Sequence, residues 1–66
     1  MDSKIPGVVV RIHGKDHEDV DVQFKDQTVS VKNHFLKHLK VGDYVTVSND
    51  MVLQILTEHQ AEKLMK

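Results

Sequence analysis

The chain has 66 residues, with nine Lys and Arg, ten Asp and Glu, five His and no cysteine. This length allows one domain with a thin core, and the lack of cysteine excludes a disulfide framework, a thiol nucleophile and a Cys-ligated zinc site. Stability must therefore come from good packing, from oligomerisation or from a partner chain. The formal net charge of −1 gives no overall attraction to nucleic acid.

The sequence contains no long apolar run and no charged-then-apolar leader. Neither a membrane span nor a signal peptide is therefore predicted, and a cytoplasmic protein is expected. Residues 1–4 are expected to form a flexible tail of a single domain that covers 1–66.

A first strand is predicted over residues 8–13, after a proline of the kind that a strand start tolerates. Alternate residues of a strand point to opposite faces of the sheet. The charged residues 14–18 are expected to form the turn that follows. One face of the strand is expected to hold Val8, Val10 and Ile12, and the other face Val9, Arg11 and His13.

A hairpin is predicted next, because residues 19–25 alternate polar and apolar side chains without a fault. A tight turn is expected at residues 26–27, and the alternation resumes over residues 28–32. The side chains expected in the core are Val20, Val22 and Phe24.

The period of the sequence changes after this hairpin. Asn33 is suited to cap a short helix over residues 34–40, and Gly42 is suited to the turn that follows it. This helix is expected to present a single apolar patch made of Phe35, Leu36 and Leu39.

The last third of the chain predicts two strands and a helix. Residues 44–48 form a strand that directs Val45 and Val47 inward; a turn at 49–50 leads into the fifth strand, 51–56. A C-terminal helix over 57–65 begins with a capping box. The cap pairs Thr57 with Gln60, and the residues expected to dock the helix on the sheet are Ala61, Leu64 and Met65.

Five short strands with a helical turn after the third strand and a short C-terminal helix predict a mainly β fold, a small five-stranded OB-like Greek-key barrel. A closed barrel also hides the edges of so small a sheet. A five-stranded SH3-like barrel is the alternative, and the helical turn favours the OB-like barrel.

Two groups of histidines are candidate metal ligands. His34 and His38 are four residues apart on the expected helix, but a closed zinc site needs two further ligands that no spacing marks. Solvated histidines on a polar helix face are the simpler interpretation, so no metal site and no cofactor is predicted. The cluster of His13, Asp16 and His17 in the first turn carries even less weight.

A run without acidic residues contains Lys32, Lys37 and Lys40 together with the two histidines, and it contrasts with the acidic stretch 16–21. With Arg11 and Tyr44, these lysines make an OB-type RNA or single-stranded DNA binder one hypothesis. Three aromatic residues in the whole chain argue against it, and a solvated surface is the simpler interpretation.

Asp19 and Asp21 share the outward face of one strand, but an open strand face offers no pocket that would separate their pKa values. No other pairing in the sequence suggests acid–base chemistry. The protein is therefore not expected to be an enzyme.

Two segments carry a resemblance to a known family. One is Ile-Pro-Gly at residues 5–7, and the other is Val-Gly-Asp-Tyr-Val-Thr-Val at 41–47, followed by Leu-Gln-Ile at 53–55 and by residues 58–61 and 64 of the closing helix. Together they resemble the HypC/HupF family of hydrogenase maturation chaperones. The resemblance implies a small barrel, a closing helix and a non-enzymatic role in which the barrel binds a protein partner.

The chain departs from this family at two positions. Family members carry a cysteine after the start methionine, which helps to hold the iron centre being assembled, and a histidine after the Val-Gly-Asp strand; here the residues are Asp2 and Ser48. A carboxylate does not replace a thiolate as a soft iron ligand. The resemblance thus implies a protein-binding barrel that has lost the metal-carrying step. Its expected contact surface consists of Asp2, Ser3, Lys4, Ser48 and Asn49.

Overall fold

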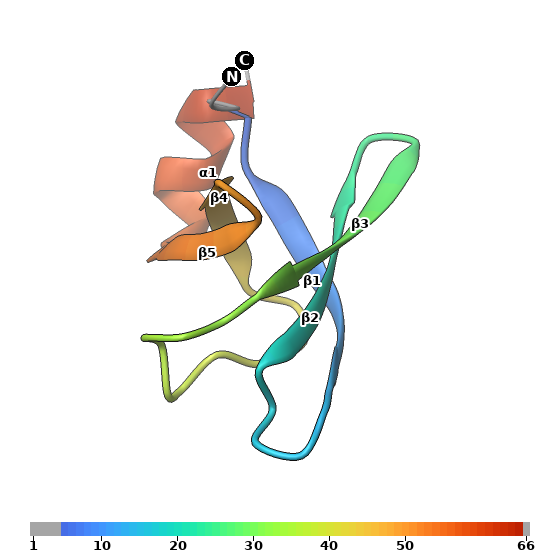
Figure 1. The fold of residues 1–66 in the computed structure, drawn as a ribbon. Helices are drawn as coiled ribbons and strands as arrows, with labels where there is room; N and C mark the ends of the chain where they lie inside the picture. The colour runs from blue at the N-terminus through green and yellow to red at the C-terminus, as the bar shows by residue number, and fades with distance from the viewer. Residues whose placement is uncertain (1–4, 66) are drawn as a thin grey trace.

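The structure, a computed structural model, describes residues 5–65, which form a five-stranded barrel followed by one short helix (Figure 1). Around the barrel the strand order is β1-β2-β3-β5-β4, and β4 pairs back with β1. The predicted five-stranded OB-like barrel is therefore confirmed. Its elements are β1 (Gly7–His13), β2 (Asp19–Phe24), β3 (Gln27–Lys32), β4 (Tyr44–Ser48), β5 (Met51–Leu56) and α1 (Glu58–Met65).

The barrel closes through a narrow contact between β3 and β5. This pair is parallel and its register holds one residue pair, Lys32 with Met51, whereas the other strand pairs are antiparallel and longer. The Lys32 N–H also donates a hydrogen bond of 2.9 Å to the Asp50 carbonyl. Because β3 leaves β5 so early, the β2–β3 hairpin extends away from β5 and α1 (Figure 1).

Valine fills the centre of the barrel. β-Branched side chains suit the pleated surface of a strand, and small ones fit the interior of a narrow barrel. Phe24 and Ile12 are partly buried and pack against this cluster, so the predicted core face of β2 is confirmed. The buried residues of the cluster are Val9, Val20, Val22, Val31, Val45 and Val52.

The predicted faces of β1 are wrong. Val9 is fully buried, whereas Val10 is 43% exposed. The register between β1 and β2 shifts between Val9 and Arg11, which is a β-bulge that places one extra residue on β1 and reverses the alternation. Ile12 packs against the core as well, because the extra residue of the bulge places Ile12 on the same face of the sheet as Val9.

The predicted helix over 34–40 is also wrong, since these residues form bends and turns. The Asn33 side chain binds Leu36 twice: its Oδ1 accepts the Leu36 N–H at 3.0 Å, and its Nδ2 donates to the Leu36 carbonyl at 2.7 Å. The Asn33 side chain thus occupies the Leu36 carbonyl, which would accept a backbone hydrogen bond in a continuing helix. A helix of seven residues also forms too few hydrogen bonds to offset the unfavourable free energy of nucleation. Gly42 ends the segment with a positive φ of 98°.

The observed β-turns lie at or within one residue of their predicted positions. The β2–β3 turn lies one residue earlier than predicted, at residues 25–26, because Phe24 pairs with Gln27. The predicted β4–β5 turn at 49–50 is confirmed, and both of its residues have positive φ, at 52° and 62°. Two left-handed residues give the primed turn that matches the twist of a hairpin.

The capping box of α1 is confirmed. The Thr57 N–H donates to Gln60 Oε1 at 3.0 Å, and the Gln60 N–H donates to Thr57 Oγ1 at 3.1 Å. Ala61 is fully buried, as expected for the residue that docks the helix. Leu64, in contrast, is 44% exposed, and the side chain of Met65 lies outside the described part of the chain.

Candidate functional site

The end of β4 holds two of the residues expected to contact a partner. β1 and β4 are antiparallel, with Gly7 opposite Val45, so the end of β4 lies at the end of the pair where β1 begins. Ser48 is half-buried there and lies opposite Met51, and Asn49 is exposed in the turn. The remaining three expected contact residues, Asp2, Ser3 and Lys4, lie outside the described residues.

The Ile-Pro-Gly segment owes its glycine to a close approach. Pro6 and Gly7 are buried, and a Cβ atom at Gly7 would collide with the Val22 side chain and lie 2.9 Å from the Phe24 ring. β1 therefore enters the barrel tightly against β2. This contact fixes the start of β1, at the end of the β1–β4 pair where β4 ends.

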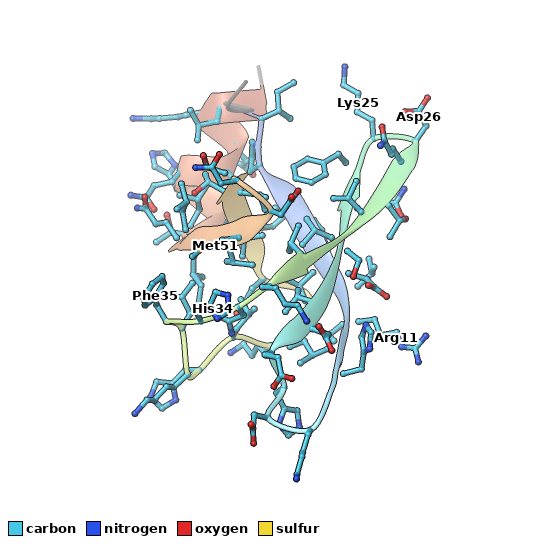
Figure 2. All side chains as sticks on the ribbon, viewed as in Figure 1. Arg11, Lys25, Asp26, His34, Phe35 and Met51 are labelled. Atoms are coloured by element: carbon cyan, nitrogen blue, oxygen red, sulfur yellow. The ribbon has the colours of Figure 1, made fainter. Side chains whose placement is uncertain are left out.

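The residues proposed for nucleic-acid binding are not brought together. Lys32 forms an ion pair with Asp19 on the neighbouring strand, and Arg11 lies opposite Asp21 in the β1–β2 register. The exposed Lys37 and Lys40 belong to the β3–β4 loop, and the half-buried Tyr44 begins β4. Figure 2 shows Arg11 on the opposite side of the barrel from His34 and Phe35.

The acidic strand is compensated by its neighbours. The hydrogen bond from Lys32 lowers the pKa of Asp19 below its ordinary value, against an opposing effect of burial, and the same bond raises the pKa of Lys32. Asp21 Oδ1 lies 3.3 Å from His13 Nε2. Both carboxylates thus join neighbouring strands, which is a structural use of these side chains.

Neither histidine group has the arrangement considered for a metal site. Without a helix, His34 and His38 lose the spacing that would place them on one face, and the His34 ring instead meets the Phe35 ring edge-on, with centroids 6.2 Å apart. Asp16 donates its N–H to the Glu18 carboxylate at 3.0 Å. Within residues 5–65, no three potential metal-ligating side chains of His, Asp or Glu gather.

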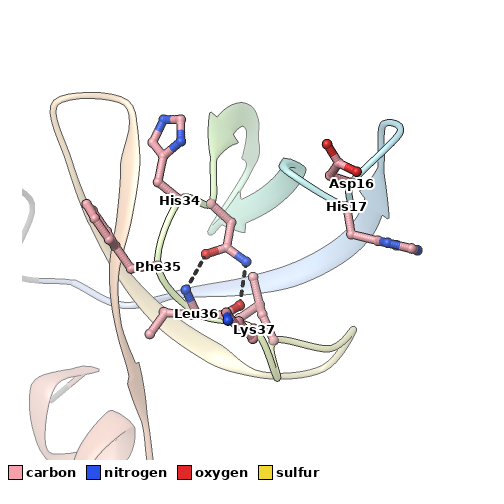
Figure 3. Close-up of a pocket in the computed structure, with 8 residues that line it drawn as sticks. Asp16, His17, His34, Phe35, Leu36 and Lys37 are labelled. Atoms are coloured by element: carbon pink, nitrogen blue, oxygen red, sulfur yellow. Dashed lines mark hydrogen bonds between the residues drawn. The ribbon is translucent and has the colours of Figure 1, made fainter.

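The β3–β4 loop, residues 33–43, has a surface that the sequence analysis missed. Leu36 and Leu39 pack against the core, whereas Phe35 is 70% exposed (Figure 3). The expected single apolar patch is therefore divided between the core and the surface. The helix hypothesis concealed this division, because only a helix places these three side chains on one face.

A hollow of about 330 Å³ lies on one side of Phe35. Its lining residues are Phe35, Leu36, Lys37, His38 and Ile55. The last of these comes from β5, so the hollow joins the loop to the barrel wall. A second, smaller hollow of about 150 Å³ lies on the loop at Asn33 and Leu39 and is bordered by Asp16 and His17 (Figure 3).

A model of the HupF/HypC family matches residues 4–66. The chain belongs to the HupF/HypC family. The match includes all six elements of the barrel and its helix, so the resemblance noted in the sequence is confirmed. No curated protein and no solved structure matches the chain. No helix among residues 5–65 has the length and apolar character needed to cross a membrane.

The HupF/HypC family is a family of hydrogenase maturation chaperones, so membership suggests a chaperone-like role and implies a protein partner. The resemblance noted in the sequence places Ser48, at the end of β4, where family members carry a histidine. A hydroxyl is a weaker ligand for iron than an imidazole, and Asp2 offers no thiolate. The donor set of this HupF/HypC member therefore does not fit the iron that other members help to carry.

Proposed function

We propose that this chain is a non-enzymatic protein-binding module, an accessory chaperone that keeps the HupF/HypC barrel and has lost the metal-carrying step. The observation that carries the proposal is the family match over residues 4–66, combined with Asp2 and Ser48 at the two metal positions.

The proposed contact surface consists of Asp2, Ser3 and Lys4 with Ser48 and Asn49 at the end of β4. The antiparallel pairing of β1 and β4 supports this grouping, because it puts the start of β1 and the end of β4 at the same end of the pair. The tight packing of Gly7 on β2 supports it as well, since it fixes the position of the start of β1.

The experiment is a pull-down with the tagged full chain from a host that makes hydrogenase, with mass spectrometry of the retained proteins. We expect a hydrogenase subunit precursor or another maturation protein to be retained. Deletion of residues 2–4 and the variant Ser48→Arg should each lose it. Ser30→Arg, an exposed change on β3, is the matched control and should retain it.

Melting curves of all variants establish that each is folded. The proposal fails if no maturation protein or hydrogenase subunit is retained by the wild-type chain. It fails equally if the folded Ser48→Arg and tail-deleted chains retain the same proteins as wild type.

Binding of RNA or single-stranded DNA is the second candidate function. The exposed Lys37 and Lys40 support it, because neither takes part in an ion pair of the described residues. However, OB-type barrels bind oligonucleotides on the face of strands 2 and 3, and here that face carries Asp19 and Asp21. Lys32, the lysine of that face, is already paired with Asp19 and is not free to bind phosphate, so we place this function second.

A further inference from the structure

The Phe35 hollow combines an apolar floor with a positively charged rim. Leu36 and Ile55 form the floor, and both pack against the barrel core. Phe35 projects beside them with 70% of its surface exposed. Lys37 and His38 complete the lining. An exposed aromatic side chain beside an apolar hollow is typical of a protein interaction site, where aromatic residues are enriched.

The residues that line this hollow include a lysine and a histidine and no acidic residue. The loop as a whole, residues 33–43, contains two lysines, two histidines and Asp43, whose carboxylate accepts the Lys40 N–H at 3.0 Å. None of the four lysine and histidine side chains belongs to an ion pair of the described residues, whereas Lys32 and His13 are each paired with an Asp of β2. The loop thus keeps two lysines that take part in no ion pair of the described residues, while the charge of Lys32 is compensated by Asp19 within the barrel.

The position of the loop is fixed from both ends. Asn33 donates its N–H to the Glu18 carbonyl at 2.8 Å, and Gly42 donates its N–H to the Val9 carbonyl at 2.8 Å. Between these anchors, Leu36 and Leu39 are held against the core. Phe35 and Lys37 are therefore presented by a braced loop, which lowers the ordering cost of binding.

We propose that this loop binds an acidic, apolar segment of a protein partner, whose apolar side chain enters the hollow between Phe35 and Ile55 while its carboxylates face Lys37 and His38. Complementary charge guides the encounter and excludes basic segments, and burial of the apolar side chain provides the affinity. The proposal goes beyond the surface formed by residues 2–4, 48 and 49, because it concerns a different part of the chain and rests only on the protein's acting through protein partners.

A protein segment fits this surface better than a nucleic acid. One lysine and one histidine line the hollow, and its other three residues are apolar. Single-stranded nucleic acid is bound by a positively charged groove with several stacking aromatics, whereas the hollow offers Phe35 alone. Asp16 lines the smaller hollow and does not line the hollow between Phe35 and Ile55.

The test uses three pools of eight-residue peptides, each with one Leu or Phe and with flanks that are acidic, basic or neutral. Binding to the full chain is measured by fluorescence anisotropy, and the contact is located by backbone amide shifts. We expect the acidic pool to bind and to shift the amides of residues 34–38 and 55. Phe35→Ala and Lys37→Glu should each weaken binding by about tenfold, the loss typical of a contact in the centre of an interface.

Two exposed residues outside the hollow provide matched controls. Val41→Ala removes an exposed apolar side chain of the same loop, and Lys25→Glu reverses a charge at the tip of the β2–β3 hairpin; both should bind the acidic pool as wild type does. Ser48→Arg should also leave peptide binding unchanged, which separates this proposal from the proposed function.

Three results would overturn the inference. The first concerns charge preference: the acidic pool binds no better than the basic or neutral pool, or no pool binds at all. The second concerns the location of binding: the amide shifts lie away from the loop, or Phe35→Ala binds the acidic pool as wild type does. The third is that an oligonucleotide shifts the same amides and binds more tightly than the acidic pool, which would assign the surface to nucleic acid.

Discussion

The Lys32 ammonium donates a hydrogen bond to the Asp19 carboxylate and thereby joins the outer faces of β3 and β2. The two residues are directly opposite each other in the register of the hairpin. This bond lowers the pKa of Asp19 and raises the pKa of Lys32. Lys32 therefore does not act together with Lys37 and Lys40 as a basic surface, because its charge is compensated by Asp19 within the barrel.

The first prediction concerns the pH dependence of this pair. A carboxyl whose pKa is lowered by folding stabilises the native state above its unfolded-state pKa, and the contribution is lost as the pH falls through the folded pKa. Lys32 contributes below its ordinary pKa, and that part is lost as the pH rises through its raised value. In Lys32→Gln we expect the pKa of Asp19 to rise toward its ordinary value, measured by NMR titration. Lys25→Gln is the control, and an unchanged Asp19 titration in Lys32→Gln would contradict the pairing.

The second prediction tests the β-bulge. Val9→Thr and Val10→Thr make the same nearly isosteric change at neighbouring positions, one fully buried and one 43% exposed. A buried hydroxyl without a partner costs about 1–3 kcal/mol, so Val9→Thr should lower the free energy of unfolding by that amount. Val10→Thr should be nearly neutral. Urea unfolding measures both, and the reverse order would restore the simple alternation.

The third prediction concerns the close approach at Gly7. In Gly7→Ala the new methyl group would overlap the Val22 side chain, and overpacking of this kind costs about 1–3 kcal/mol. We expect a lower melting temperature with a cooperative transition, measured by circular dichroism. Ser30→Ala, at an exposed position of β3, should melt as wild type does. A Gly7→Ala chain as stable as wild type would show that β1 has room to move away from β2.

The fourth prediction concerns the cap of α1. Loss of the threonine hydroxyl in Thr57→Ala leaves the Gln60 N–H without its acceptor and should cost about 1 kcal/mol. Thr57→Ser keeps the hydroxyl and should recover most of this loss in chemical unfolding. Equal stability of the alanine and serine variants would mean that the cap adds nothing to the fold.

The fifth prediction separates protein binding from nucleic-acid binding. Nonspecific contact has dissociation constants of about 10⁻⁴ to 10⁻⁶ M at physiological salt, and we expect labelled RNA and single-stranded DNA to bind no more tightly. Tyr44→Ala should not change this weak binding. If Lys37 and Lys40 did meet phosphates, each contact would contribute about −0.7 to the slope of log affinity against log salt. Nanomolar binding that Tyr44→Ala abolishes would make the chain a nucleic-acid-binding protein.

Local patterns in the sequence determined most of the elements. The faultless alternation of 19–25 predicts β2 and its core valines. The pair at 49–50 predicts the turn between β4 and β5, and the spacing of Thr57 and Gln60 predicts the start of α1. Each of these signals depends on residues a few positions apart. The order of the strands was therefore enough to predict a small five-stranded barrel, whereas the helix that favoured the OB-like over the SH3-like form is replaced by bends and turns.

Only the tertiary structure decided which residues face the core in β1 and in the β3–β4 loop. Val8, Val9 and Val10 are identical in the sequence, and the face of each depends on a bulge that forms against β2. Phe35 is exposed because Asn33 closes on Leu36 and the barrel core takes Leu36 and Leu39. The hollow beside Phe35 needs Ile55 from β5, and the charge of Lys32 is compensated by Asp19 from β2. These contacts join parts of the chain that are far apart in the sequence, so the periodicity of a short segment cannot predict them.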